Sequence, residues 1–352
     1  MDKVFDGIAG RLHISDPEMY VNNEARSRSG HMSHAMVEYA PGKIIAFNSN
    51  CSATRAAGHS AFGYVEYRFS EDYGKSWSDI NILSCSMDVL LDGVHTVSVE
   101  KAVCCNNVIT AFILFNSQQR ESCCEPWAAP AFIQSYDNGR TWTPVQELSP
   151  WAGRVYDAVV NDGVIYVLMF CNPEHIGTTQ LDVYRLYKSF DNGKTFKMCS
   201  VVDLPCIGYS YGALQFRSDG SLVAYANNIH NGYYMAMSVS YDCGETWQLQ
   251  PLAKLREGIR NVQISRLGKG YVIHGRAYRD ACYGKGHVIY TSLDGLHWDD
   301  GILLEPEKVS CYYSDNLLLR KEDGSETLLV QYSDSYDGYA KVNVMLMFMH
   351  FE

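Results

Sequence analysis

The chain has 352 residues, of which 47% are hydrophobic and 20% charged, so it holds enough apolar material for a large buried core. Its formal net charge of −11 argues against a nucleic-acid partner, because such proteins bind by neutralising phosphates with positive charge. No run of about 18 apolar residues occurs, so we expect neither a membrane-spanning segment nor a membrane partner.

The start of the chain and its cysteines bear on cellular location. Residues 1–15, MDKVFDGIAGRLHIS, contain no apolar stretch of the kind found in export signals. Twelve cysteines are scattered without CxxC spacing, which is typical of reduced thiols in a cytosolic protein. We therefore expect a cytoplasmic protein, or a secreted one if an export signal was removed ahead of this sequence.

Six units of similar pattern follow one another along the chain. Each contains an alternating or apolar run, a short turn, a strongly apolar run, a polar loop and a third run. The runs are short, rich in β-branched and aromatic residues, and bounded by Gly-containing turns, so they are predicted to be strands. In chain order the units occupy residues 33–50 with 64–77, 96–117 with 129–142, 154–172 with 181–196, 211–228 with 233–247, 261–279 with 287–298, and 314–335 with 341–351.

The first five units end in one recurring turn sequence. A full copy has Ser first, Asp third, Gly fifth and an aromatic residue last. The Asp can accept backbone N–H bonds across the turn, and the Gly tolerates positive φ. Copies that recur at intervals of about 50 to 65 residues indicate a repeat architecture. The copies are residues 70–77, 135–142, 189–196 and 240–247, with a shortened copy at 292–298.

Six units of three to four strands predict an all-β fold, namely a six-bladed β-propeller that forms a single domain over residues 1–352. A single blade cannot bury both of its faces, so the blades must stack on one another. The sixth unit lacks the turn sequence and a fourth strand. We expect residues 4–14 to supply this outer strand, so that the N-terminal strand closes the last blade and covers its edge.

The turn pattern S-x-D-x-G-x-[ST]-W is the Asp box, and the whole chain resembles the sialidase superfamily of Asp-box, or BNR-repeat, propellers. In that superfamily the Asp boxes lie at the blade periphery, away from the central pocket. The resemblance therefore implies structural roles for Asp72, Asp137, Asp191 and Asp242. Asp boxes also occur in polysaccharide lyases, in other glycosidases and in binding propellers.

The candidate site lies where the inner strands begin. In a propeller these strands line the axis, and function usually lies on loops that a rigid scaffold holds. On the predicted face the sequence concentrates Arg, His and Tyr, although the protein is acidic overall. Arginine forks bind carboxylates in bidentate fashion. Aromatic rings stack on sugars, so the predicted partner is an acidic oligosaccharide that contains sialic or uronic acid.

Sialidases hold the substrate carboxylate with three arginines and use a Tyr nucleophile, a supporting Glu and an Asp as acid/base. The family's Tyr opens blade six before a Ser, so the resemblance implies Tyr313 as nucleophile. It also implies Arg276, with Arg279 and Arg28, as the residues that hold the carboxylate. The inner strand of blade four begins with Tyr211, where the resemblance would place the supporting Glu.

The candidate set has a catalytic and a substrate-binding part, and we expect no metal or other cofactor. The predicted catalytic residues are Tyr313, Asp315, Asp334 and His31. The predicted substrate-binding residues are Arg28, Arg276, Arg279, Tyr211, Tyr312, Asn48 and Asp157.

The leading functional hypothesis is a glycoside hydrolase that acts on an acidic oligosaccharide. One alternative is a lyase on uronic-acid polysaccharides, in which a His or Tyr abstracts a proton and an Arg or Asn neutralises the carboxylate. Another is a propeller that binds glycans without turnover. The sequence leaves the sugar, the linkage, the stereochemical outcome and the oligomeric state open.

Overall fold

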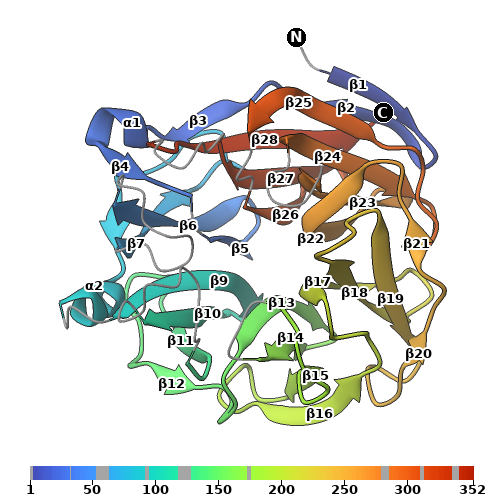
Figure 1. Ribbon diagram of the computed structural model, residues 1–352. Helices are drawn as coiled ribbons and strands as arrows, with labels where there is room; N and C mark the ends of the chain where they lie inside the picture. Colours follow the sequence, from blue (N-terminus) through green and yellow to red (C-terminus); the bar gives the residue numbers. More distant parts are fainter. Residues whose placement is uncertain are drawn as a thin grey trace.

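The computed structural model describes residues 3–31, 33–52, 63–91, 95–117, 128–172, 176–278, 285–309, 313–334 and 341–352. These residues are almost entirely β, with two short helices, α1 (Asn23–Arg26) and α2 (Ser84–Leu90). Six antiparallel sheets stand in a ring around one axis (Figure 1). The predicted six-bladed propeller is confirmed. No helix in the described part of the chain is long and apolar enough to cross a membrane.

The first three blades each run outward from an innermost strand. Blade one consists of β5 (His34–Ala40), β6 (Lys43–Ser52), β7 (Gly63–Ser70) and β8 (Asn81–Ile82), with β4 (Arg28–Ser29) also paired to β6. Blade two consists of β9 (His95–Cys105), β10 (Val108–Ser117), β11 (Ala131–Ser135) and β12 (Gln146–Glu147). Blade three consists of β13 (Arg154–Asn161), β14 (Val164–Cys171), β15 (Val183–Ser189) and β16 (Lys197–Val202).

The next two blades repeat this plan. Blade four consists of β17 (Tyr209–Phe216), β18 (Leu222–Asn228), β19 (Tyr234–Ser240) and β20 (Gln248–Leu249), with β21 (Ala253–Lys254) also paired to β19. Blade five consists of β22 (Gly258–Leu267), β23 (Gly270–Tyr278), β24 (Lys285–Ser292) and β25 (Ile302–Val309).

Blade six joins the two ends of the chain. Its strands are β26 (Ser314–Arg320), β27 (Glu326–Ser333), β28 (Val344–Phe351), β2 (Gly10–Ile14) and β1 (Lys3–Gly7), with β3 (Glu18–Val21) also paired to β28. The predicted closure by the N-terminal segment is confirmed, and this segment supplies a two-stranded hairpin rather than one strand. Leu12 lies opposite Phe351, and Ile14 opposite Met349, so the apolar side of β2 extends the core.

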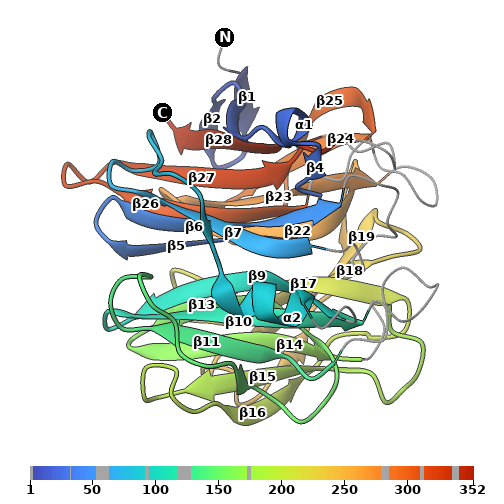
Figure 2. The same cartoon turned by 90° about the vertical axis from the view of Figure 1, so that its left-hand side faces the viewer.

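Apolar clusters fill the spaces between neighbouring blades. Phe47 of blade one and Val97 of blade two belong to one cluster, and Tyr184 and Leu214 join blades three and four in another. The side view shows the sheets layered across the molecule (Figure 2). At the centre the innermost strands β5, β9, β13, β17, β22 and β26 contact one another in a closed ring. The ring brings residues far apart in the sequence to one axis.

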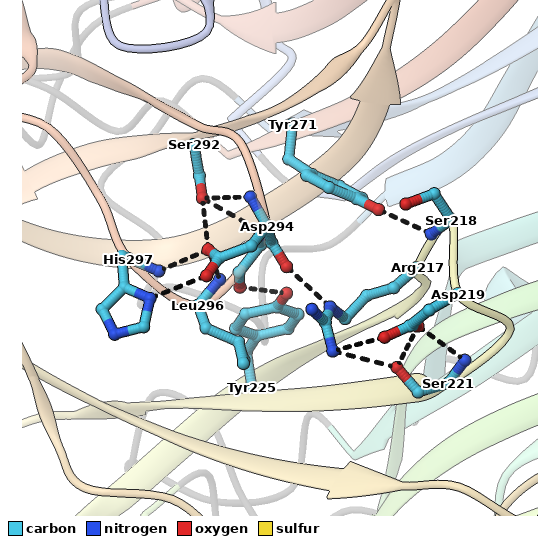
Figure 3. A network of polar contacts seen from close by, with 11 residues as sticks. Arg217, Ser218, Asp219, Ser221, Tyr225, Tyr271, Ser292, Asp294, Leu296 and His297 are labelled. Atoms are coloured by element: carbon cyan, nitrogen blue, oxygen red, sulfur yellow. Dashed lines mark hydrogen bonds and ion pairs between the residues drawn. The ribbon is translucent and has the colours of Figure 1, made fainter.

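The recurring turns share one hydrogen-bond pattern at the blade periphery. In blade three the Ser189 hydroxyl accepts the N–H of Gly193 (2.8 Å), and Asp191 accepts from the N–H and hydroxyl of Thr195 (2.9 and 2.6 Å). In the shortened turn of blade five, His297 donates to Asp294 through its ring (2.7 Å), and Arg217 of blade four donates to the Asp294 carbonyl (Figure 3). These turns therefore tie each outer edge together and, here, two blades to each other.

Candidate functional site at the start of the inner strands

The axis holds two cavities in the described part of the chain, separated by a buried ion cluster. The larger, of about 500 Å³, lies at the C-terminal ends of the inner strands, and the smaller, of about 40 Å³, lies at their N-terminal ends. Between them the Lys101 ammonium contacts Asp315 at 2.5 Å, Asp157 at 3.2 Å and Gln263 at 3.2 Å. Lys101 lines the larger cavity and Gln263 the smaller, so this cluster closes the axis.

Two arginines that line the larger cavity are paired with carboxylates outside its lining. Arg217 pairs with Asp219 at 3.0 Å, and Arg320 pairs with Glu326 at 2.7 Å. The smaller cavity differs because phenol groups line it together with Arg154, and further arginines lie against two of those phenol rings. We therefore take the smaller cavity as the candidate site and call it the axial pocket.

All six blades contribute to the axial pocket. Its volume is about 40 Å³, which has room for about three waters. The lining residues are Ser33, His34, Glu100, Arg154, Tyr156, Tyr211, Gly212, Asn261, Val262, Gln263, Tyr313 and Ser314.

Three arginines surround the phenols of this pocket. The Arg154 guanidinium carbon lies 5.7 Å from the Tyr211 ring centre, and that of Arg260 lies 5.8 Å from the same ring. The Arg276 guanidinium carbon lies 5.6 Å from the ring centre of Tyr313. Arg260 and Arg276 stand directly opposite each other on β22 and β23. Directly opposed like charges destabilise a sheet. Proteins depart from what stability favours mainly at functional sites, so this arginine pair is typical of such a site.

Glu100 fixes the orientation of the first of these arginines. Its carboxylate contacts the Arg154 guanidinium at 2.5 Å and accepts from the hydroxyls of Ser33 (2.5 Å) and Ser98 (2.9 Å). Both carboxylate oxygens are therefore engaged. The bond to the guanidinium is charge-assisted, and such bonds are stronger than those between neutral groups. Glu100 is thus a positioning residue for Arg154 rather than a free acid or base.

Tyr211 and Tyr313 both line the pocket, and each ring lies against an arginine. Burial raises the pKa of Tyr211, but the charges of Arg260, Arg154 and Arg276 outweigh burial, so its pKa lies below the ordinary tyrosine value. The neighbouring Tyr156 is also buried, and there burial dominates and raises the pKa. The pocket therefore favours ionisation at one particular phenol.

His34 lines the pocket as a neutral side chain. Burial, with His31 nearby, lowers the pKa of His34 to about 3. Its Nε2 atom forms a hydrogen bond with the Ser333 hydroxyl (2.8 Å). In the described residues no group of three His, Cys, Asp or Glu side chains is arranged to hold a metal ion.

The structure brings together three of the residues predicted from the sequence. Tyr313 and Tyr211 line the axial pocket, and Arg276 packs on Tyr313. Asp315 and Asp157 instead belong to the buried cluster around Lys101, where backbone N–H groups of Met36 and Leu214 also bond them (2.7 Å each). These two carboxylates close the axis below the pocket.

The remaining predicted residues that the structure describes lie away from the lining of the pocket. Arg28 donates to Asn50 and packs on Tyr64 within blade one. His31 is buried beside Ser29 (2.8 Å), and Asn48 is buried on β6. Asp334 lies 3.4 Å from Lys308, just beyond β27. Arg279 and Tyr312 lie outside the described residues.

Sequence reasoning left out two of the three arginines. Arg154 and Arg260 both stand at the beginning of inner strands, β13 and β22. The rule that inner strands begin at the functional face selects these positions. The signal was therefore present in the strand pattern, whereas the carboxylate-binding set came from the resemblance, which implied Arg28, Arg276 and Arg279.

Comparisons with solved structures agree with this architecture. A protein of unknown function from Dyadobacter fermentans has a TM-score of 0.75 at 14% identity, with 97% of this chain and 99% of that chain covered. The Hadza microbial sialidase has a TM-score of 0.68 at 14% identity, with 94% and 68% covered. Trypanosoma rangeli sialidase in complex with sialic acid has a TM-score of 0.63 at 15% identity. This alignment covers 96% of this chain and 58% of that one.

The protein thus has the same six-bladed propeller fold as these sialidases, and at 14–15% identity the likeness shows the fold alone. No protein-family model and no curated protein matches the sequence.

Proposed function

We propose that the protein is a glycoside hydrolase that acts on an acidic saccharide. The observation that carries the proposal is the convergence of Arg154, Arg260 and Arg276 on two phenol rings that line the axial pocket. The arginines hold the sugar carboxylate by charge-assisted hydrogen bonds. The structural neighbour from T. rangeli, solved with sialic acid, supports this choice of substrate class.

In this proposal Tyr313 is the nucleophile. A phenol suits an anomeric carbon that carries a carboxylate, because the carboxylate would repel an anionic nucleophile. Tyr313 lines the pocket, and Arg276 lies over its ring, so the phenol lies next to one of the cations proposed to hold the substrate. The Tyr313 oxygen bonds to the anomeric carbon as the bond from that carbon to the leaving oxygen breaks, and the phenol proton passes to the departing oxygen. Water then attacks the same carbon, the Tyr313–carbon bond breaks, and a proton from the water returns to the Tyr313 oxygen.

The test is turnover of aryl glycosides of sialic and glucuronic acid by the wild type and Tyr313→Phe. We expect Tyr313→Phe to lower kcat at least about a thousand-fold with unchanged thermal unfolding. Tyr278→Phe is the matched control, since this phenol donates to the His230 carbonyl and lies outside the pocket lining. Unchanged turnover by Tyr313→Phe would exclude Tyr313 as nucleophile.

A second candidate function is glycan binding without turnover. Glu100 is the single carboxylate among the described lining residues, and it is engaged with Arg154 and two serines. A pocket without a free acid favours binding, because hydrolysis of an ordinary glycosidic bond requires protonation of the leaving oxygen. Saturable binding of acidic sugars with no cleavage of aryl or natural glycosides would favour this function.

A further inference from the structure

Three residues that line the axial pocket carry buried polar atoms with no hydrogen-bond partner in the described part of the chain. These atoms are Nδ1 of His34, the side-chain oxygen of Asn261 and the hydroxyl oxygen of Ser314. The three residues are 3%, 5% and 8% exposed. Buried polar groups in proteins are nearly always paired, so unpaired groups gathered at one cavity point to a ligand that pairs with them.

The hydrogen bonds around Ser333 determine which nitrogen of His34 carries the proton. The Ser333 hydroxyl donates its one hydrogen to the Gly30 carbonyl at 2.9 Å, since a carbonyl can only accept. The Ser333 oxygen also lies 2.8 Å from His34 Nε2, so it accepts there and Nε2 carries a hydrogen. Burial keeps the ring neutral, because it lowers the pKa of His34 to about 3. In a neutral ring the other nitrogen, Nδ1, is therefore an acceptor.

Asn261 is turned out of its strand by a bulge beside the arginine pair. The register of β22 against β23 shifts between Arg260 and Gln263, and within this bulge the φ of Asn261 is +57°. Gly275 lies opposite, where a Cβ atom would come within 2.6 Å of the Arg260 carbonyl oxygen. The Asn227 side chain braces the bulge with hydrogen bonds of 3.1 and 3.3 Å to its backbone. Left-handed backbone that its neighbours hold in this way gathers at functional sites.

Two other side-chain acceptors of the lining are directed at the protein itself. Glu100 accepts from an arginine and two serines, and the Gln263 oxygen accepts from Lys101 at 3.2 Å. His34 Nδ1 and the Asn261 oxygen remain as acceptors for a ligand. An ionised carboxylate has only acceptor oxygens, so it cannot pair with either of them. The hydrogens must come from other groups of the ligand, and the hydroxyls of a sugar are such donors.

We propose that His34 and Asn261 accept hydrogen bonds from ring hydroxyls of the bound sugar acid. The pocket then selects a hydroxylated sugar acid over a ring that carries the carboxylate alone. The inference rests on the function proposed above, in which the arginines hold the carboxylate. Because the pocket of about 40 Å³ has room for about three waters, the hydroxyls concerned are those nearest the carboxylate. A ligand without them leaves two buried acceptors unpaired, which disfavours its binding.

Calorimetric titration of the intact protein with three acids tests the inference. Tetrahydropyran-2-carboxylic acid is the ring that glucuronic acid and N-acetylneuraminic acid share, with the carboxylate beside the ring oxygen and no hydroxyl. We expect the wild type to bind at least one of the two sugar acids at least about a hundredfold more tightly than this bare ring acid. Competition against the sugar acid measures the weaker binding. Equal affinities would overturn the inference and leave the carboxylate site in place.

Variants assign the difference in affinity to the two acceptors. His34→Gln keeps a side-chain N–H for Ser333 and removes the acceptor at Nδ1, and Asn261→Gly keeps the left-handed backbone and removes the amide. Each should weaken the sugar acid about tenfold and leave the bare ring acid within about twofold, whereas Arg260→Gln should weaken both acids. Asn138→Gly is the matched control, because Asn138 has a φ of +62° in an exposed turn of blade two, and it should change neither affinity.

The other adverse outcomes separate this inference from the proposed function. Equal weakening of both acids by His34→Gln and Asn261→Gly would assign the two side chains to the scaffold of the pocket. Unchanged binding of the sugar acid in both variants would show that its hydroxyls bind elsewhere. Either result overturns the inference and leaves the hydrolase proposal standing, whereas binding of no acid by the wild type would remove both. The two variants act separately, so the test stays decisive if one of them does not fold.

Discussion

Arg260 and Arg276 show at the scale of single residues how this pocket departs from what stability favours. The two side chains face each other across β22 and β23, and each also lies over a tyrosine ring. Directly opposed like charges cost roughly 0.2–1 kcal/mol in a sheet. A fold that retains such a pair at its axis trades stability for a cationic site.

This cost leads to a prediction for Arg276→Gln. The variant should unfold at the same or higher denaturant concentration, by about 0.2–1 kcal/mol, because it removes one of two opposed charges. It should at the same time weaken the binding of acidic sugars at least about tenfold, since a charged hydrogen bond is lost. Urea unfolding and calorimetric binding check the two effects. Lower stability with intact binding would assign Arg276 to the scaffold.

The sequence predicted part of this site, and the reason lies in particular residues. The resemblance to sialidases singled out Tyr313 and the position of Tyr211 on the inner strand, and both residues line the pocket. Asp315 and Asp157 occupy similar positions on β26 and β13, but they turn toward Lys101. A side chain on an inner strand can face the axial pocket or the buried cluster around Lys101. Which of the two it faces depends on register and bulges, which a single sequence does not specify.

At the scale of strands, a pair of buried histidines links blades five and six. His274 on β23 stacks on His287 on β24 at 5.2 Å, and His274 also bonds Asn316 of β26 (3.1 Å). Burial lowers the pKa of His287 to about 3 and places that of His274 well below the ordinary value. Both rings are therefore neutral in the folded protein at neutral pH.

The histidines predict that stability falls as the pH falls. In the unfolded chain each ring takes up a proton near about pH 6.5, whereas the folded chain does not until much lower pH. The free energy of unfolding should then decrease by about 1.4 kcal/mol per pH unit for each buried His between about pH 6 and pH 4. His287→Gln should reduce this slope by the contribution of one proton. His230→Gln, a change at an exposed residue, should leave the slope unchanged. Urea unfolding at several pH values measures these slopes. Equal slopes for the wild type and His287→Gln would contradict the prediction.

Local turn chemistry explains why the fold was predictable at this scale. The Ser189–Asp191–Gly193 bonds lie within one short segment, so the sequence encodes them directly. The short helices α1 and α2 were not predicted, because each has only a turn or two and little periodic pattern. The extra strand β1 also went unpredicted as a separate element, since the tight turn before Gly10 has no strong hairpin signature.

At the scale of the whole molecule, the ring depends on the hairpin that the N-terminal segment adds to blade six. Leu12 and Ile14 are fully buried against β28, beside Met349. Figure 1 shows the two ends of the chain at this same blade. Closure of this kind makes the last blade a nonlocal structure that covers the edge of β28.

Leu12→Ala tests the importance of the closure. The change leaves a cavity in the blade-six core and should lower the free energy of unfolding by about 2–5 kcal/mol. Ile8→Ala is the matched control, because Ile8 is 54% exposed in the same hairpin and should change stability by less than about 0.5 kcal/mol. Chemical denaturation checks both variants. Equal effects would show that the hairpin does not close the ring.

The central claim is that the axial pocket recognises a carboxylate with Arg154, Arg260 and Arg276. Calorimetric titration of the intact protein with glucuronic acid and with glucose tests it most directly, because these sugars differ only in the carboxylate. N-acetylneuraminic acid, titrated beside them, distinguishes a sialic acid site from a uronic acid site. The account predicts saturable binding of at least one acidic sugar, weakened at least about tenfold in Arg260→Gln, and none of glucose. Binding of glucose as tight as that of glucuronic acid, or no binding of either acid, would contradict it.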